Sequence, residues 1–246
     1  MKDYFRQTRT WTYSILAVLP LLLVYEFLIM VVNLGREMSV RVGADVWMKR
    51  LVSDLSGTWH VTIGLVLFVA GLIVFAVDRK KDVVIRPRYF GWMLLETVIY
   101  AIVLALAISA TVGLLFANLW PIADAGGGFA KLGLGTQVAL SLGAGLYEEL
   151  VFRVILVGGL YYIIRRLTVS GPRPYIAAAF IGAIIFSTVH YIGPYADTFA
   201  LASFVFRFLF GLALNALYLV RGFGVAAWTH AIYDLYVVSL LYTRAA

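Results

Sequence analysis

Long runs of apolar residues follow one another along most of the chain, separated by short polar segments. A helix that crosses the hydrocarbon core of a bilayer needs about 20 consecutive, mostly apolar residues. By that measure the sequence predicts about seven spans, of which the third and fourth are long enough to tilt or kink. The runs lie near Trp11–Leu34, Thr58–Val77, Phe90–Trp120, Thr136–Ile164, Tyr175–Ile192, Thr198–Val220 and Phe223–Tyr242.

An eighth element is expected over Val40–Leu55. This segment mixes Val, Trp and Leu with charged residues such as Arg41, Lys49 and Asp54. That composition favours a helix lying in the membrane interface over a span. The predicted fold is therefore all-α: a polytopic transmembrane helical bundle of about seven to eight helices. It forms a single membrane-embedded domain over residues 1–246.

Composition points to lipid as the solvent of this chain. Of the 246 residues, 63% are hydrophobic and 13% are charged, whereas a soluble domain is about half apolar and a quarter charged. The net charge of +7 comes without a basic stripe interleaved with aromatic residues, so we expect contact with membrane lipid and no nucleic-acid partner. Cysteine is absent, which excludes disulfides, thiolate zinc sites and a cysteine nucleophile.

Positive charges in the loops are distributed unequally between the two sides of the predicted bundle. Cytoplasmic loops of membrane proteins carry an excess of Lys and Arg. This rule favours a cytoplasmic N-terminus. The inner loops would then hold Lys2, Arg6, Arg9, Arg79, Lys80, Lys81, Arg86, Arg88, Arg165, Arg166, Arg173 and Arg221, against Arg36, Arg41, Lys49, Arg50, Lys131 and Arg244 outside.

Two adjacent carboxylates, Glu148 and Glu149, lie in the middle of the fourth apolar run. A charge at membrane depth costs at least a few kcal/mol, so it indicates a function by default. Glu149 and Arg153 are one helical turn apart and can pair. Glu148 points about 100° away and has no partner on its own helix. The alternative interpretation is a buried ionic cluster with a purely structural role.

The histidines add to this set. His190 lies in the fifth apolar run and His230 in the seventh. Asp234 follows His230 at helical spacing, so its carboxylate can fix the orientation and tautomer of that imidazole. The third histidine, His60, stands next to Trp59 at a helix entrance, where interface anchoring explains it.

The remaining polar residues within apolar runs are given structural roles. Arg207 is expected to snorkel towards the interface or to pair with Glu26 or Glu96. Asn215 is expected to form a hydrogen bond between helices. Gly211 fits close packing of two helices.

A carboxylate and an imidazole in a confined cavity can take a proton from water, which then attacks an amide carbonyl. A second imidazole with its carboxylate can stabilise the oxyanion or protonate the leaving amine. The same residues, Glu148, His190 and His230, are also a known type of zinc ligand set, although no His-Glu-x-x-His run occurs. Intramembrane Glu and His residues also build the proton relays of transporters, so a proton-coupled carrier is a second hypothesis.

Three motifs occur in order, each in its own apolar run. They resemble the motif set of the CPBP family, which comprises the CAAX prenyl endopeptidases and their bacterial bacteriocin-processing and self-immunity (Abi) relatives. The resemblance is to the bacterial branch and covers residues 136–240, the protease-like core. The motifs are Glu148-Glu149-x-x-x-Arg153, Phe186-x-x-x-His190 and His230-x-x-x-Asp234.

The resemblance implies an intramembrane endopeptidase in which Glu148 activates water with the help of His190. His230 and Asp234 would form the oxyanion-stabilising side. Supporting roles would fall to Glu149, Arg153 and Phe186.

The resemblance also implies a setting and a substrate. The protein would be a multi-pass protein of the bacterial cytoplasmic membrane that cleaves a membrane-associated peptide or protein, with a prenylated CAAX-like sequence as a candidate. No cofactor is expected; zinc held by Glu148, His190 and His230 is the alternative. A non-catalytic scaffold of the same fold, such as an immunity or sorting protein, is the third hypothesis.

Overall fold

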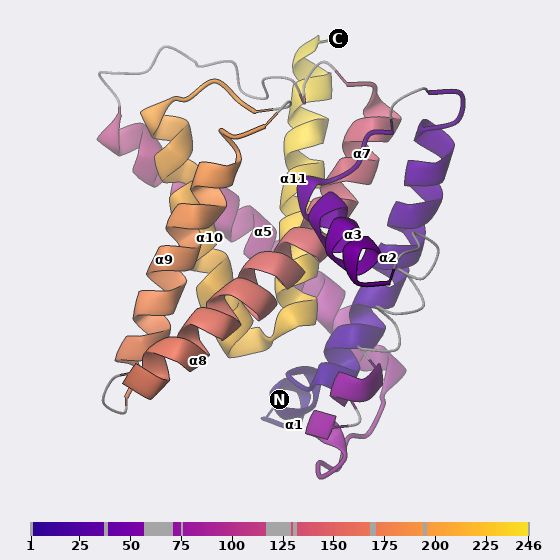
Figure 1. Ribbon diagram of the computed structural model, residues 1–246, viewed down its shortest axis with the longest axis vertical. Coiled ribbons are helices and arrows are strands. Elements are labelled where there is room, and N and C mark those ends of the chain that lie inside the picture. Colours follow the sequence, from indigo (N-terminus) through magenta and orange to yellow (C-terminus); the bar gives the residue numbers. More distant parts are fainter. Residues whose placement is uncertain are drawn as a thin grey trace.

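The computed structural model of the protein describes residues 2–36, 39–56, 71–74, 76–116, 129, 132–167, 171–193 and 196–245. All regular secondary structure within these ranges is helical, which confirms the predicted all-α bundle. The helices, labelled as in Figure 1, are α1 (Lys2–Thr8), α2 (Trp11–Val32), α3 (Gly43–Ser56), α5 (Pro87–Leu115), α7 (Leu134–Gly143), α8 (Gly158–Leu167), α9 (Arg173–Val189), α10 (Leu201–Arg221) and α11 (Phe223–Ala245).

Three of the described helices, α2, α5 and α10, are long and apolar enough to cross a membrane, and α9 is a shorter apolar helix. They correspond to the first, third, sixth and fifth predicted runs. The second predicted span, near Thr58–Val77, lies mostly outside the described residues, as does His60. The helix expected at Val40–Leu55 is α3.

The fourth predicted run is one continuous helical segment that changes character along its length. Between α7 and α8 the backbone forms two π-helical stretches, Ala144–Glu148 and Leu150–Val157. Figure 1 shows that α7 and α8 point in different directions. The expected kink therefore occurs where the two carboxylates lie, and π-helical turns inside α-helices are frequent at functional sites.

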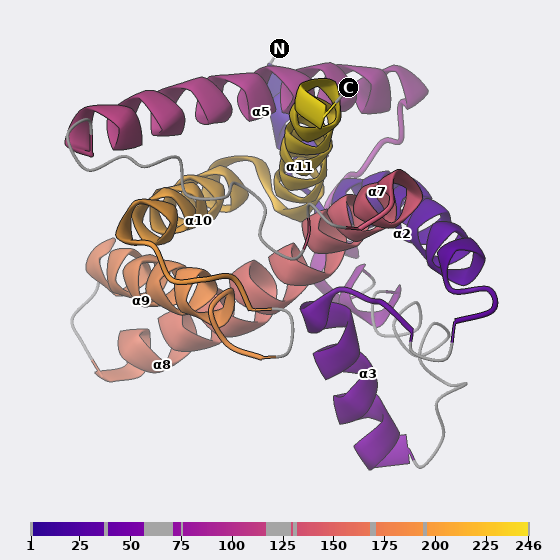
Figure 2. The same ribbon diagram turned by 90° about the horizontal axis from the view of Figure 1, so that it is seen from above.

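Helix α11 stands at the centre of the bundle (Figure 2), in contact with α2, α5, α7, α10 and the first π-helical stretch. Gly145 permits this approach. A Cβ atom at that position would lie 2.5 Å from the carbonyl oxygen of Ala227 and 2.6 Å from the Cβ of Ala231. Because real Cβ atoms do not approach so closely, glycine is required for the carboxylate-bearing segment to pack on α11.

The structure agrees with two of the minor expectations. Asn215 of α10 donates a hydrogen bond from Nδ2 to the carbonyl of Ala179 of α9, at 2.8 Å. A Cβ on Gly211 would lie 3.1 Å from the ring of Phe186 and 3.3 Å from the Cβ of Ala183. Small residues and an interhelical hydrogen bond thus hold α9 against α10.

The expectation that Arg207 pairs with Glu26 or Glu96 is wrong. Its guanidinium forms an ion pair with Asp197 and donates 2.8 Å hydrogen bonds to Tyr191 and Ser203. Glu96, one of its two expected partners, pairs with Arg221. The other, Glu26, pairs with cations near and within α3. These ion pairs join different segments of the chain. The hydropathy pattern could not predict them, because it does not show which segments lie next to each other in the fold.

A buried ionic cluster fixes α3 to the rest of the bundle. Glu26 of α2 and the fully buried Asp45 of α3 each lie within 3.3 Å of both Arg41 and Lys49. The hydroxyl of Tyr147 donates to Glu26 at 3.1 Å. Because Tyr147 immediately precedes Glu148, this cluster helps to position the π-helical segment.

Candidate active site

The predicted site residues come together from three helical segments: the π-helical stretches, α9 and α11. Phe186 of α9 lies in the middle of them. Its ring centroid is 4.5 Å from the Cζ of Arg153, 5.1 Å from the ring of His190 and 6.1 Å from the ring of His230. Phe210 of α10 closes the far side, 5.3 Å from His230 between ring centroids. Phe186 therefore separates the two imidazoles and stacks beneath the guanidinium.

Glu149 is fully buried and contacts two partners. Its Oε1 lies 3.0 Å from Nη1 of Arg153 and 2.7 Å from Nδ1 of His230. The first contact confirms the pairing that helical spacing predicted. The second was not predicted. Because an ionised carboxylate can only accept hydrogen bonds, Nδ1 of His230 carries the proton.

Asp234 occupies a different position from the one that its spacing suggested. Its Oδ2 lies 3.6 Å from Nε2 of His230, which is ion-pair range and too long for a hydrogen bond. Glu149, from another helix, makes the hydrogen bond that orients the imidazole. Asp234 therefore faces the outer nitrogen of His230, on the side that is partly exposed.

His190 lies directly after α9, as its C-cap residue. Its Nδ1 is 2.8 Å from the carbonyl oxygen of Phe186. A carbonyl oxygen only accepts, so Nδ1 is the donor and Nε2 of the neutral ring keeps a free lone pair. The ring is thereby fixed with its basic nitrogen directed away from its own helix.

Glu148 is half-buried, and none of the described residues forms a hydrogen bond or an ion pair with its carboxylate. Positive charge at His230, Arg153 and Arg207 acts on it electrostatically. Arg207 and His230 also act on His190. Glu148 thus has no ion-pair or hydrogen-bond partner among the described residues, and it lies within electrostatic range of His230 and Arg153.

The donor set was also compared with the needs of a metal ion. Within the described residues, no group of three or more His, Asp or Glu side chains is placed to hold one. In the predicted zinc set of Glu148, His190 and His230, Nδ1 of His230 is bound to Glu149, and Nε2 lies 3.6 Å from Oδ2 of Asp234. A zinc ion needs deprotonated nitrogen donors at about 2.0–2.1 Å, so Nε2 is the nitrogen of His230 that could serve.

Comparison with known proteins gives one result for this chain. Residues 131–236 match the family model described as Type II CAAX prenyl endopeptidase Rce1-like. The matched segment includes all seven predicted site residues. No curated protein and no solved structure matches.

Proposed function

We propose that the protein is an intramembrane endopeptidase that cleaves a CAAX-like substrate, because residues 131–236 match the model of the Rce1-like, type II CAAX prenyl endopeptidase family. The observation that carries the proposal is the unpaired carboxylate of Glu148 beside the cluster of Glu149, Arg153 and His230. A half-buried acid without a partner in that position is available to act as a base.

Glu148 is the proposed general base. Its carboxylate takes one proton from a water molecule while the water oxygen attacks the carbonyl carbon of the scissile peptide bond. The free Nε2 of His190 accepts the second hydrogen of the same water and so orients it. The carbonyl π electrons move to oxygen, which becomes the oxyanion of a tetrahedral intermediate.

His230 is the proposed stabiliser of that oxyanion. With Nδ1 bound to Glu149, its Nε2 is the nitrogen that can donate to developing negative charge. Asp234 favours the protonated form of this imidazole. The intermediate collapses when the C–N bond breaks and the proton held by Glu148 passes to the leaving amine.

The supporting residues act by positioning Glu148 and His230. Arg153 balances the charge of Glu149, and the Phe186 ring packs against Arg153 and both imidazoles. We assign the chemistry to the protein groups alone. Activity is then expected to withstand exhaustive treatment with a chelator.

The substrate is proposed to be a peptide or protein held at the membrane, with a prenylated CAAX sequence as the first candidate. The setting is proposed to be the bacterial cytoplasmic membrane with the N-terminus in the cytoplasm. In support, the C-terminal ends of α8 and α10 and the N-terminal ends of α9 and α11 lie at the same end of the bundle as the N-terminus (Figure 1). These ends carry Arg165, Arg166, Arg173 and Arg221.

The test is cleavage of a fluorogenic prenylated CAAX peptide by the purified protein in detergent, beside the same peptide without its prenyl group. Glu148→Ala and His190→Ala are expected to abolish cleavage at unchanged fold. Asp54→Asn, which changes an exposed carboxylate of α3 outside the site, serves as the control. Cleavage by Glu148→Ala at the wild-type rate would contradict the assignment of Glu148 as the base, whereas absence of cleavage by the wild-type protein would leave the scaffold or the proton-coupled carrier as the function.

A further inference from the structure

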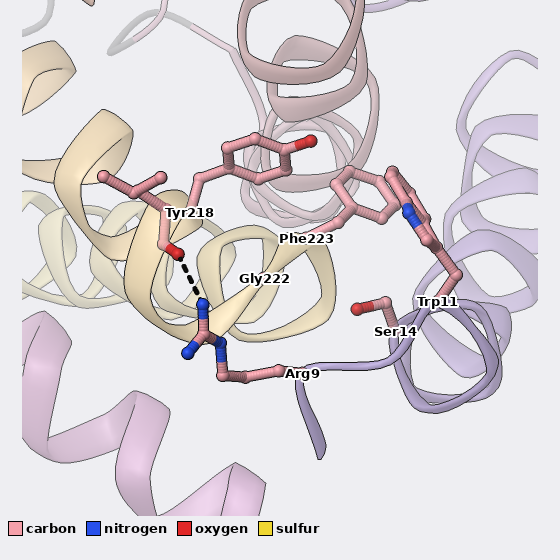
Figure 3. Close-up of a pocket in the computed structure, with 7 residues that line it drawn as sticks. Arg9, Trp11, Ser14, Tyr218, Gly222 and Phe223 are labelled. Carbon is pink, nitrogen blue, oxygen red and sulfur yellow. Dashed lines mark hydrogen bonds between the residues drawn. The ribbon is translucent and has the colours of Figure 1, made fainter. Parts of the chain in front are cut away.

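A polar cavity of about 210 Å³ lies outside the candidate active site, where α2 and α11 begin and α10 ends. Figure 3 shows its lining side chains, which come from all three helices and from the segment before α2. They include Arg9, Trp11, Ser14, Tyr218, Gly222 and Phe223.

The position of the cavity relative to the membrane follows from its helices. Both α2 and α10 are long and apolar enough to span a bilayer, and the cavity lies where one starts and the other stops. That is the depth of the lipid headgroups. Trp11 suits this depth, because tryptophan is enriched at the boundary between hydrocarbon and water.

The cavity presents positive charge and free hydrogen-bond donors. Arg9 is exposed and donates from Nη2 to the carbonyl of Leu219 at 3.2 Å. The first backbone hydrogen bond into α11 is donated by Ala226 to Gly222, at 3.3 Å. The N–H groups before Ala226, beginning with Phe223, therefore lack helical partners and carry the positive end of the helix dipole. No acidic residue of the described chain lines the cavity.

Ser14 supplies an independent indication of a ligand. Its side chain is 2% exposed, and no described residue forms a hydrogen bond with its hydroxyl. Figure 3 shows the hydroxyl directed into the space between Arg9 and Phe223. The hydroxyl oxygen of this otherwise buried residue therefore borders the cavity, where it is free to bond to a ligand.

Gly222 keeps the space beside that hydroxyl open. Its φ of 86° is a conformation that glycine adopts without strain. A Cβ atom here would lie 3.4 Å from the Ser14 hydroxyl and 3.5 Å from the carbonyl oxygen of Arg9. The tight turn between α10 and α11 thus leaves room where a side chain would otherwise fill the cavity.

We propose that this cavity binds the phosphate of a phospholipid headgroup. A phosphate accepts hydrogen bonds from a guanidinium, from amides at a helix N-terminus and from a hydroxyl at the same time. The aromatic rings of Trp11 and Phe223, with centroids 6.3 Å apart, flank the polar groups. The half-exposed Leu219 continues the lining outward as an apolar surface for the lipid's glycerol and chains.

The test needs no enzymatic activity, so it is independent of the proposed function. The full chain is purified in an uncharged detergent, stripped of lipid and titrated with phosphatidylglycerol, with binding followed by native mass spectrometry. Inorganic phosphate and an uncharged diacylglycerol are titrated in parallel. Saturable binding of phosphatidylglycerol, with little binding of either of the others, is expected.

Variants assign the binding to the cavity. Arg9→Gln and Ser14→Ala are each expected to weaken phosphatidylglycerol binding about tenfold or more, as for hydrogen bonds to a charged group. Arg6→Gln is the matched control, because Arg6 is equally basic and near in sequence but its side chain is 75% exposed and pairs with Asp3. If Ser14→Ala fails to fold, Arg9→Gln and Arg6→Gln decide the question alone.

Two results would overturn the proposal. One is equal binding by wild type, Arg9→Gln and Arg6→Gln, which would mean that the lipid binds elsewhere or only to general surface charge. The other is binding of inorganic phosphate as tight as that of phosphatidylglycerol, which would make the cavity a site for a free anion.

Discussion

Two buried ionic clusters in this protein differ in how completely their charges are matched. In the cluster that fixes α3, the two acids Glu26 and Asp45 lie among two cations, and each acid lies within 3.3 Å of both. In the candidate active site, Glu149 pairs with Arg153 and His230, Asp234 faces His230, and Glu148 has no ion-pair partner within the described residues. The active-site cluster therefore contains more carboxylates than permanently charged cations.

The two clusters also differ in how their charged atoms are hydrogen-bonded. The guanidinium of Arg153 is buried, and none of its three nitrogen atoms has a hydrogen-bond partner within the described residues. One oxygen of Glu149 is also without a partner there. In the α3 cluster, tyrosine hydroxyls donate to both acids, and the one acid oxygen there without a hydrogen bond, Oδ1 of Asp45, lies 3.0 Å from Nζ of Lys49. A matched cluster holds a fold together, whereas an unmatched one leaves groups available for water and substrate.

The largest effect is expected when one charge of the active-site cluster is removed. Arg153→Met leaves Glu149 as an uncompensated buried charge, which costs about 3–5 kcal/mol of stability. The double variant Glu149→Gln/Arg153→Met is expected to recover most of that loss, because no isolated charge remains, but to stay inactive. Thermal denaturation and peptide cleavage measured on the same samples check both statements. Recovery of activity by the double variant would show that this pair serves stability alone.

The approach of the carboxylate segment to α11 gives the next largest effect. Gly145→Ala is expected to lower stability by about 1–3 kcal/mol through overpacking against Ala227 and Ala231. It should lower the cleavage rate as well, since it displaces Glu149 from His230. Gly113→Ala, where a Cβ meets nothing within 4 Å, is the control in α5. Equal melting temperatures for the two variants would contradict this packing.

A smaller effect on stability and rate is expected at Tyr147, which connects the α3 cluster to the candidate active site. Tyr147→Phe removes the 3.1 Å hydrogen bond to Glu26 and should cost about 0.5–1.5 kcal/mol. Because Tyr147 precedes Glu148, kcat should fall while KM changes little. Tyr162→Phe, an exposed tyrosine of α8, is the control. An unchanged kcat for Tyr147→Phe would mean that the α3 cluster does not position the base.

The smallest effect concerns a carboxylate outside both clusters. Burial acts to raise the pKa of Asp78, but hydrogen bonds from Lys81 and from the backbone and hydroxyl of Thr12 outweigh it and hold the pKa below its usual value. Asp78 therefore contributes stability above its unfolded pKa of about 3.9, which is lost as pH falls through the lower folded pKa. Asp78→Asn should destabilise at pH 6 and show a shrinking deficit below about pH 4. A deficit independent of pH would contradict this.

Much of the fold was predictable, because lipid imposes a simple length and polarity rule on spanning helices. The apolar runs predicted α2, α5, α9 and α10, and helical spacing predicted the contact of Glu149 with Arg153. The two π-helical stretches were not predictable. They change the backbone hydrogen-bond register without any local marker in the apolar pattern.

The geometry of the site was less accessible to sequence reasoning. The hydrogen bond between Glu149 and His230 joins residues far apart in sequence and depends on the close packing at Gly145. Helical spacing favoured Asp234 as the orienting acid, since it reports only neighbours on one helix. For the same reason the partner of Arg207, Asp197, was missed. Gly145, three residues before Glu148, is the residue that permits the close approach.

The most direct measurement compares one isosteric change in each cluster. Glu148→Gln and Asp45→Asn each replace a carboxylate by its amide, and the single-turnover cleavage rate is measured with melting temperature as the check on folding. The account predicts a loss of about 10²–10⁴-fold for Glu148→Gln with a nearly unchanged melting temperature. For Asp45→Asn it predicts lower stability and a modest loss of rate. Cleavage by well-folded Glu148→Gln within about twofold of wild type would contradict the assignment of Glu148 as the base.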